Sequence, residues 1–262
     1  MTTALRRWLV LGAVLLTGVL LPAGQARPTP PRLLMVTYSA GYEHEVVRRP
    51  AGGGLSLAER VVAALARRSG RFTVTYVATR GELEALSVAS VQAHQAMLFF
   101  TTGELPLAPA VREAIFKRIR EGAGFVGVHS ATDTWYTVPE YRQLVGGVFA
   151  GHPWHQRVTI LVEDRQHPAT RHLGAAFDVT DEIYQFRDWS RTGVHVLLRL
   201  DPRSVEIAQG NRPDADYALA WSGQHGRGRV IYTALGHEPA MWADERFQAH
   251  VLGAVESVLP GP

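Results

Sequence analysis

The chain has 262 residues, 46% of them apolar, and its 27 basic and 24 acidic residues give a formal net charge of +3. This length suits one large domain or two small ones, and the composition is that of a globular protein with a real core. The chain contains no cysteine, which excludes disulfides, thiolate nucleophiles and zinc–sulfur sites.

Residues 1–26 have the pattern of a secretory signal: two arginines precede the apolar run 8–21, and small residues favour a cut after Ala26. A retained anchor helix and twin-arginine export are the alternatives. Removing the two arginines from the 27 basic residues leaves 25 against 24 acidic ones, so nucleic acid is not an expected partner. We expect a Pro-rich leader at 27–32 and a periplasmic or secreted protein without stable membrane insertion after cleavage.

The first half of the folded chain alternates strands with helices. Its strands are almost wholly apolar, which is typical of a parallel sheet buried on both faces. The glycine-rich segment 48–54 reads as a mobile loop. The expected elements are a strand at 33–38, a helix at 57–68 capped by Ser56, strands at 72–77 and 96–101, a helix at 109–121 and a strand at 124–128.

The second half contains more strands and fewer helices. We therefore expect one doubly wound α/β domain over 33–260, with a mixed sheet, helices on both faces and a β-rich second half. The expected elements are strands at 155–163, 182–186, 195–200, 217–221 and 229–233, and a closing helix at 244–259.

Polar, titratable residues follow four of the expected strands. If these strands are parallel, their ends gather on one rim of the sheet, where open α/β proteins build ligand sites. The four segments are 39–44, which ends in His44, 101–104, which ends in Glu104, His129-Ser130, and 235–239, which contains His237 and Glu238.

Three histidines at this rim are candidates for a proton carrier, because imidazole changes charge near neutral pH. His129 directly follows a buried strand, and His237 has Glu238 beside it. The alternative for His129 is a core histidine bonded to backbone, and for His44 a surface-loop histidine. Glu238 could equally be a solvated turn residue.

His152 and His155 are three positions apart and can present two imidazoles to one metal ion. Further ligands would come from His129, His237, Asp133 or Glu182. Without cysteine the site would have nitrogen and oxygen donors, which suits a divalent ion such as Zn or Mn. The alternative is that one histidine bonds backbone while the other faces a pocket.

Glu182 and Tyr184 lie on one face of the strand expected at 182–186. Carboxylates can perform acid–base chemistry on a glycoside, and aromatic rings stack on sugar C–H groups. The alternatives are an exposed acidic turn and core packing. The expected catalytic residues are His129, His237 and Glu182, and the expected substrate-binding residues are His44, Trp135, Tyr184, Trp154 and Glu104.

Several motifs together resemble the ThuA-like (trehalose utilisation) family of the class I glutamine amidotransferase-like superfamily. The resemblance spans most of 33–258 and implies a flavodoxin-like, amidotransferase-like mixed sheet. The motifs are Ser-Ala-Gly-Tyr-Glu-His at 39–44, Thr-Thr-Gly-Glu at 101–104, Gly-Val-His-Ser-Ala at 127–131, Gly-Gly-Val-Phe-Ala-Gly-His-Pro at 146–153, His155-Gln156, Val-Glu-Asp at 162–164, His167-Pro168, Asp-Glu-Ile-Tyr at 181–184, Gly236-His237 and Trp242.

The resemblance implies that His129 stands where amidotransferases of this class carry their cysteine. Thioester chemistry is then excluded. Ser130 is a poor substitute because it sits one place late and needs a base. The family's association with sugar catabolism implies a carbohydrate-related activity, and a keto-glycoside is apt because its carbonyl acidifies the adjacent C–H bond.

We therefore expect a small-molecule carbohydrate partner and an enzyme, a hydrolase or lyase acting on sugars or keto-glycosides by His/carboxylate or metal-assisted chemistry. A non-catalytic carbohydrate-binding or sensing protein on a degenerate amidotransferase-like fold is the alternative. A third hypothesis is an interaction module whose β-rich half mediates a homo-oligomer.

Overall fold

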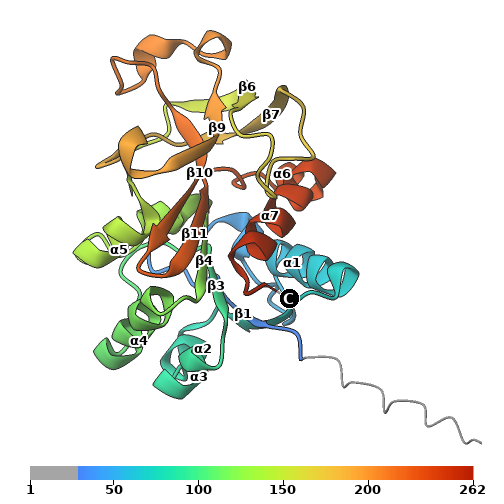
Figure 1. Cartoon of the computed structure of the whole chain (residues 1–262), viewed down its shortest axis with the longest axis vertical. Helices are drawn as coiled ribbons and strands as arrows, with labels where there is room; N and C mark the ends of the chain where they lie inside the picture. Colours follow the sequence, from blue (N-terminus) through green and yellow to red (C-terminus); the bar gives the residue numbers. More distant parts are fainter. Residues whose placement is uncertain (1–28, 262) are drawn as a thin grey trace, which may run out of the picture.

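A mixed nine-stranded sheet organises the residues that the computed structural model describes, 29–261, in the order β2-β1-β3-β4-β11-β10-β9-β6-β7 (Figure 1). The expected signal segment 1–26 lies outside these residues. Within them, no helix is long and apolar enough to cross a bilayer.

One half of the sheet is parallel. All neighbouring pairs from β2 to β11 run in the same direction, and β3 and β4 are buried along their whole length. The four strands expected to share a rim, β1, β3, β4 and β11, are therefore parallel as predicted. The strands are β2 (Thr73–Val77), β1 (Arg32–Val36), β3 (Ala96–Phe99), β4 (Gly124–Val128) and β11 (Gly228–Thr233).

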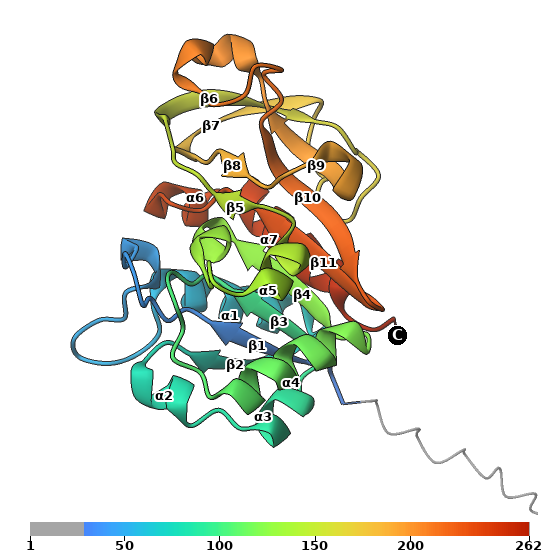
Figure 2. The same ribbon diagram turned by 90° about the vertical axis from the view of Figure 1, so that its left-hand side faces the viewer.

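The other half is antiparallel and extends the sheet beyond β11 (Figure 2). It is the predicted β-rich portion, so the mixed α/β fold class is confirmed. Its strands are β10 (Ala218–His225), β9 (His195–Leu200), β6 (Trp154–Val162) and β7 (Ala176–Ile183), and a separate two-stranded sheet pairs β5 (Val148–Phe149) with β8 (Phe186–Arg187).

The strand expected at 182–186 was placed wrongly. β7 begins at Ala176 and ends at Ile183, and its exposed and half-buried first half interleaves polar residues such as Asp178 and Thr180 with apolar ones. β7 is an edge strand, and its buried end contains two acidic residues, Asp181 and Glu182, so hydrophobic patterning does not mark the strand along its length.

Helices cover both faces of the parallel half: α1 and α7 on one side, α4 and α5 on the other (Figure 1). Ser56 and Glu59 form the capping box of α1, and Gly70 ends it in a left-handed conformation. The helices are α1 (Leu57–Ser69), α2 (Arg80–Glu84), α3 (Val88–Gln92), α4 (Pro109–Arg120), α5 (Pro139–Val145), α6 (Pro239–Ala243) and α7 (Glu245–Val258), with 3-10 turns η1 (Glu45–Val47), η2 (His129–Asp133), η3 (Arg191–Gly193), η4 (Pro202–Ser204) and η5 (Ile207–Gln209).

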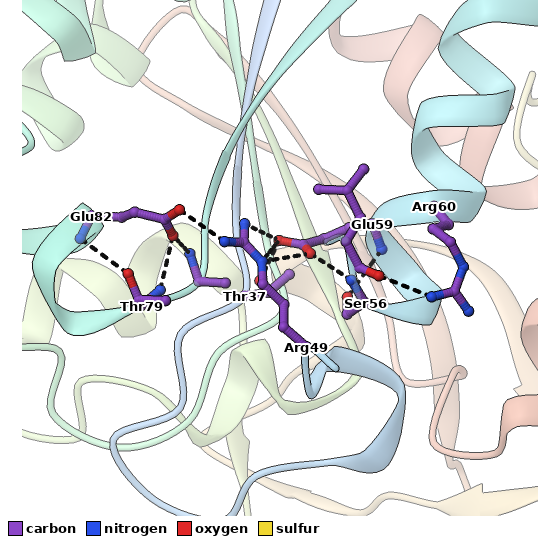
Figure 3. Close-up of polar contacts among 9 residues, drawn as sticks. Thr37, Arg49, Ser56, Glu59, Arg60, Thr79 and Glu82 are labelled. Atoms are coloured by element: carbon purple, nitrogen blue, oxygen red, sulfur yellow. Dashed lines mark hydrogen bonds and ion pairs between the residues drawn. The ribbon is translucent and has the colours of Figure 1, made fainter. Parts of the chain in front are cut away.

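The segment expected as a mobile loop, 48–54, is anchored at one residue. The Arg49 guanidinium lies between two carboxylates, 2.8 Å from Glu59 of α1 and 2.8 Å from Glu82 of α2 (Figure 3). Glu59 is fully buried and also accepts a hydrogen bond from Thr37 beyond β1. A buried carboxylate is costly unless it is paired and hydrogen-bonded, so Arg49 ties this loop to α1 and α2.

Candidate active site

Four side chains from distant parts of the chain meet at the carboxyl end of the parallel strands. Each offers a ligand atom, and these atoms lie within 4.8 Å of one another. His44 follows β1, His129 follows β4, His237 follows β11, and Glu182 is at the end of β7. The sheet topology therefore joins residues that are 193 positions apart at the extremes.

The Glu182 carboxylate is surrounded by imidazoles. Its Oε2 lies 3.1 Å from His237 Nδ1 and 3.5 Å from His129 Nε2, and those two nitrogens are 3.3 Å apart. Its Oε1 lies 3.2 Å from His152 Nδ1. We call His44, His129, Glu182 and His237 the inner group.

His129 is held in a backbone conformation that few residues adopt. It begins the turn η2 with φ of +46°, in the left-handed region where a side chain costs about 1–2 kcal/mol. Its ring is fully buried, and Nδ1 lies 2.6 Å from the carbonyl oxygen of Ala234. Because a carbonyl only accepts, Nδ1 carries the proton, and in the neutral ring Nε2 presents a lone pair to Glu182.

Asp181 positions the turn that carries His237. Its buried carboxylate accepts hydrogen bonds from the backbone N–H groups of Gly236 at 2.7 Å and Glu238 at 3.0 Å. Gly236 has φ of +120°, and a Cβ there would lie 3.1 Å from the Phe247 ring, so glycine is required. Burial raises the pKa of Asp181 above its ordinary value, while these hydrogen bonds oppose the rise.

Three members of the inner group, His44, Glu182 and His237, line a cavity of about 470 Å³, a size suited to a small molecule. His155 lies at its rim and donates from Nε2 to Glu238 at 2.6 Å. The Tyr42 side chain is 66% exposed beside the opening. The lining residues are Tyr42, His44, Asp133, Phe149, His152, His155, Glu182, Tyr184 and His237.

The electrostatics of the inner group follow from burial and charge pairing. Burial, together with the neighbouring His129 and His237, lowers the pKa of His44 to about 3, so its ring is neutral at ordinary pH. Burial alone would raise the pKa of Glu182, but the neighbouring imidazoles of His129 and His237 bring it well below its ordinary value. The hydrogen bond to Glu182 raises the pKa of His237.

The structure brings most of the sequence-predicted site residues together. The predicted catalytic residues His129, His237 and Glu182 are in contact, and His44 and Tyr184 border the same cavity. The other predicted binding residues lie elsewhere. Trp135 and Trp154 are buried core residues whose indole N–H groups donate to the carbonyls of Leu105 and Glu206, and the Glu104 carboxylate accepts from the backbone and side chain of Thr137.

The predicted metal pair, His152 and His155, is divided between two partners. His152 contacts Glu182, whereas His155 bonds Glu238. In the described residues the compact, buried group that could hold a metal is the inner group. A second, more exposed group consists of His155, His237 and Glu238. Spacing in the sequence could not show this, because the ligands come from four separate segments.

Sequence reasoning missed Tyr42 and Phe149 as cavity residues and the turn-holding role of Asp181. The Asp-Glu pair at 181–182 was visible, but only the fold shows that the two carboxylates point to different partners. Ser130, the residue after His129, has a buried hydroxyl with no hydrogen-bond partner in the described residues. It therefore lacks the base that a serine nucleophile requires.

A wider groove of about 640 Å³ lies along β10 and η3. His195, which lines this groove, already bonds the Asp164 carboxylate at 2.8 Å. The smaller cavity gathers convergent imidazoles and a carboxylate with a shifted pKa, which is the signature of a functional site. Of the two, the smaller cavity beside the inner group is therefore the better candidate for the active site.

A family model described as ThuA, trehalose utilisation, matches residues 32–257. The chain belongs to the ThuA family. Two solved ThuA-like proteins share its fold with a TM-score of 0.68. The protein from Bacteroides uniformis is 23% identical over 91% of this chain and 95% of its own. The protein from Parabacteroides merdae is 16% identical over 88% and 90%.

PurLQS from Thermotoga maritima is similar to this ThuA-family chain with a TM-score of 0.51 and 13% identity, over 87% of this chain and 99% of that one. The amidotransferase-like fold is thus confirmed, while the chain's lack of cysteine excludes the thiol chemistry of that class. No curated protein matches the chain.

Proposed function

We propose that this ThuA-family protein is an exported enzyme that acts on a sugar or a keto-glycoside. The observation that carries the proposal is the Glu182 carboxylate, which lines the cavity and is surrounded by the imidazoles of His129, His152 and His237. Trehalose utilisation is the description of the family. Tyr42, Phe149 and Tyr184 supply aromatic faces around the same cavity, which suits the C–H faces of a sugar ring.

The proposed reaction is β-elimination from a keto-glycoside. A base removes the proton next to the carbonyl, the C–H electron pair forms an enolate, and the enolate expels the glycosidic oxygen, which takes a proton. His155 is the candidate base: its Nε2 donates to Glu238, so in the neutral ring the other nitrogen can accept. The inner group would stabilise the negative oxygen of the enolate, by a protonated imidazole or a bound cation.

The test is turnover of trehalose and its 3-keto derivative, followed by NMR. We expect consumption of the keto-glycoside and release of free sugar. His155→Ala should lower the rate by roughly 10²–10⁴-fold, the usual contribution of a general base. His172→Ala, an exposed histidine outside the cavity, is the matched control and should keep the wild-type rate.

Sugar binding without any product would contradict the enzyme and favour the alternative, a non-catalytic carbohydrate-binding protein. The loss of the superfamily's cysteine is the observation that motivates this alternative. Calorimetry with the same two sugars separates the outcomes, since a binding protein gives heat of association and no product.

A further inference from the structure

We propose that the inner group is a binding site for one zinc-like divalent cation, with His129 Nε2, His237 Nδ1 and Glu182 Oε2 as its ligand face. This deepens the proposed function by stating what these residues hold. It does not depend on the identity of the sugar, because the cation is expected to bind in its absence.

The first argument is geometric. The three donor atoms are separated by 3.1, 3.3 and 3.5 Å. A tetrahedral zinc site with bonds of about 2.0–2.1 Å has donor atoms about 3.3 Å apart. The three atoms therefore already have the spacing of one face of a tetrahedron.

The second argument counts protons. Nδ1 of His129 donates to the Ala234 carbonyl, so the neutral ring points a lone pair at the Glu182 carboxylate, which also only accepts. A single proton on His237 Nδ1 cannot serve as hydrogen-bond donor to both Glu182 Oε2 and His129 Nε2, which both only accept. A cation between the three atoms resolves this conflict without placing a charged imidazole in a fully buried position.

The surrounding contacts are those of a metal site. Ligating histidines usually donate their other N–H to a carbonyl or carboxylate, as His129 does to Ala234. Glu182 is steadied at its second oxygen by His152, and Asp181 fixes the turn that carries His237. Each ligand thus has a neighbour that sets its orientation.

His44 faces the remaining side of this site. Its Nδ1 is buried without a hydrogen-bond partner in the described residues, and its ligand atom lies within 4.8 Å of the other three. His44 lines the same cavity as Glu182 and His237, which places it beside the ligand face. Two imidazoles and one carboxylate, with a third imidazole beside them, favour Zn²⁺ over Mn²⁺ or Mg²⁺, which prefer oxygen donors.

The experiment is calorimetric titration of the untagged, full protein with Zn²⁺ alone and with Mn²⁺ alone, after treatment with a chelator and its removal. We expect one Zn²⁺ per chain, bound more tightly than Mn²⁺. Glu182→Gln and His237→Ala should weaken Zn²⁺ binding by at least about 100-fold, and His44→Ala by about 10–100-fold. His172→Ala should bind as the wild type does.

Co²⁺ absorption gives a second readout that does not depend on affinity, because tetrahedral Co²⁺ absorbs visible light far more strongly than octahedral Co²⁺. We expect the strong spectrum in the wild type and its loss in Glu182→Gln, with circular dichroism confirming that the variant is folded. Wild-type Zn²⁺ affinity no greater than that of Glu182→Gln would overturn the proposal. A wild-type protein that binds no Zn²⁺ and still turns over a keto-glycoside would also overturn it, yet leave the proposed function intact.

Discussion

At the scale of single residues, His129 combines an unfavourable backbone with a fixed ring. Its φ of +46° is one that a non-glycine residue avoids, while its imidazole bonds Ala234 and faces Glu182. This conformation turns the chain out of β4 and directs the ring into the inner group, and the hydrogen bond to Ala234 helps to hold it there. Strain at such a position is typical of functional sites.

This strain leads to a prediction about stability. His129→Gly and His129→Ala both remove the ring, but only glycine relaxes the backbone, so the glycine variant should be more stable by about 1 kcal/mol. Urea unfolding measures the difference. At Glu113, exposed within α4, the order should reverse, because glycine is about 1 kcal/mol worse than alanine in a helix interior. The same order at both positions would show that residue 129 is unstrained.

At the scale of elements, Arg49 joins the loop after His44 to α1 and α2 (Figure 3). The Glu59 side chain is fully buried, whereas 39% of the Glu82 side chain is exposed. The two ion pairs are therefore unequal. Removing the partner of a buried charge is far more costly than removing an exposed one.

We expect Arg49→Ala to destabilise the fold by about 3–5 kcal/mol, since it leaves Glu59 buried without its cation. Glu82→Gln should cost less than about 1 kcal/mol. Urea unfolding midpoints report both. Adding Glu59→Gln to Arg49→Ala removes the stranded charge and should recover part of the loss. If the two single variants proved equally stable, Glu59 would not depend on Arg49.

At the scale of the whole molecule, the alternation of apolar strands and helices was sufficient to predict the parallel half, the β-rich half and the rim where the site lies. The short helices α2, α3, α5 and α6 and most of β7 were not predicted. Helices of five to seven residues carry too few turns for a periodic signal. The grouping around Glu182 depends on β7 reaching the rim, which no local pattern encodes.

Buried neutral histidines should make the folded state sensitive to acid. Burial, helped by the nearby His172 and His167, lowers the pKa of His250 in α7 to about 4, and its Nδ1 donates to the Ala169 carbonyl at 2.8 Å. The unfolded chain takes up this proton near pH 6.5. The contribution to stability is therefore fully present above pH 6.5 and is lost as the pH falls towards 4.

The measurement is urea unfolding at pH 7 and pH 5. His250→Asn keeps a donor for the Ala169 carbonyl and cannot titrate, so its loss of stability between these pH values should be smaller than that of the wild type by about 2 kcal/mol. His172→Asn, at an exposed neighbour that contributes less to this shift than burial does, should change the pH dependence far less than His250→Asn. An unchanged pH dependence in His250→Asn would show that His250 is not the group that titrates.

The position of β11 has a consequence for how the protein is made. β11, the last strand among the described residues, lies between β4 and β10, in the interior of the sheet. Until residues 228–233 have been synthesised, the growing polypeptide leaves β4 and β10 with unpaired edges, and such edges invite pairing with other chains. His237 follows directly, so completion of the sheet and assembly of the site depend on the same segment, and chains truncated before residue 228 are expected to aggregate rather than accumulate as partly active fragments.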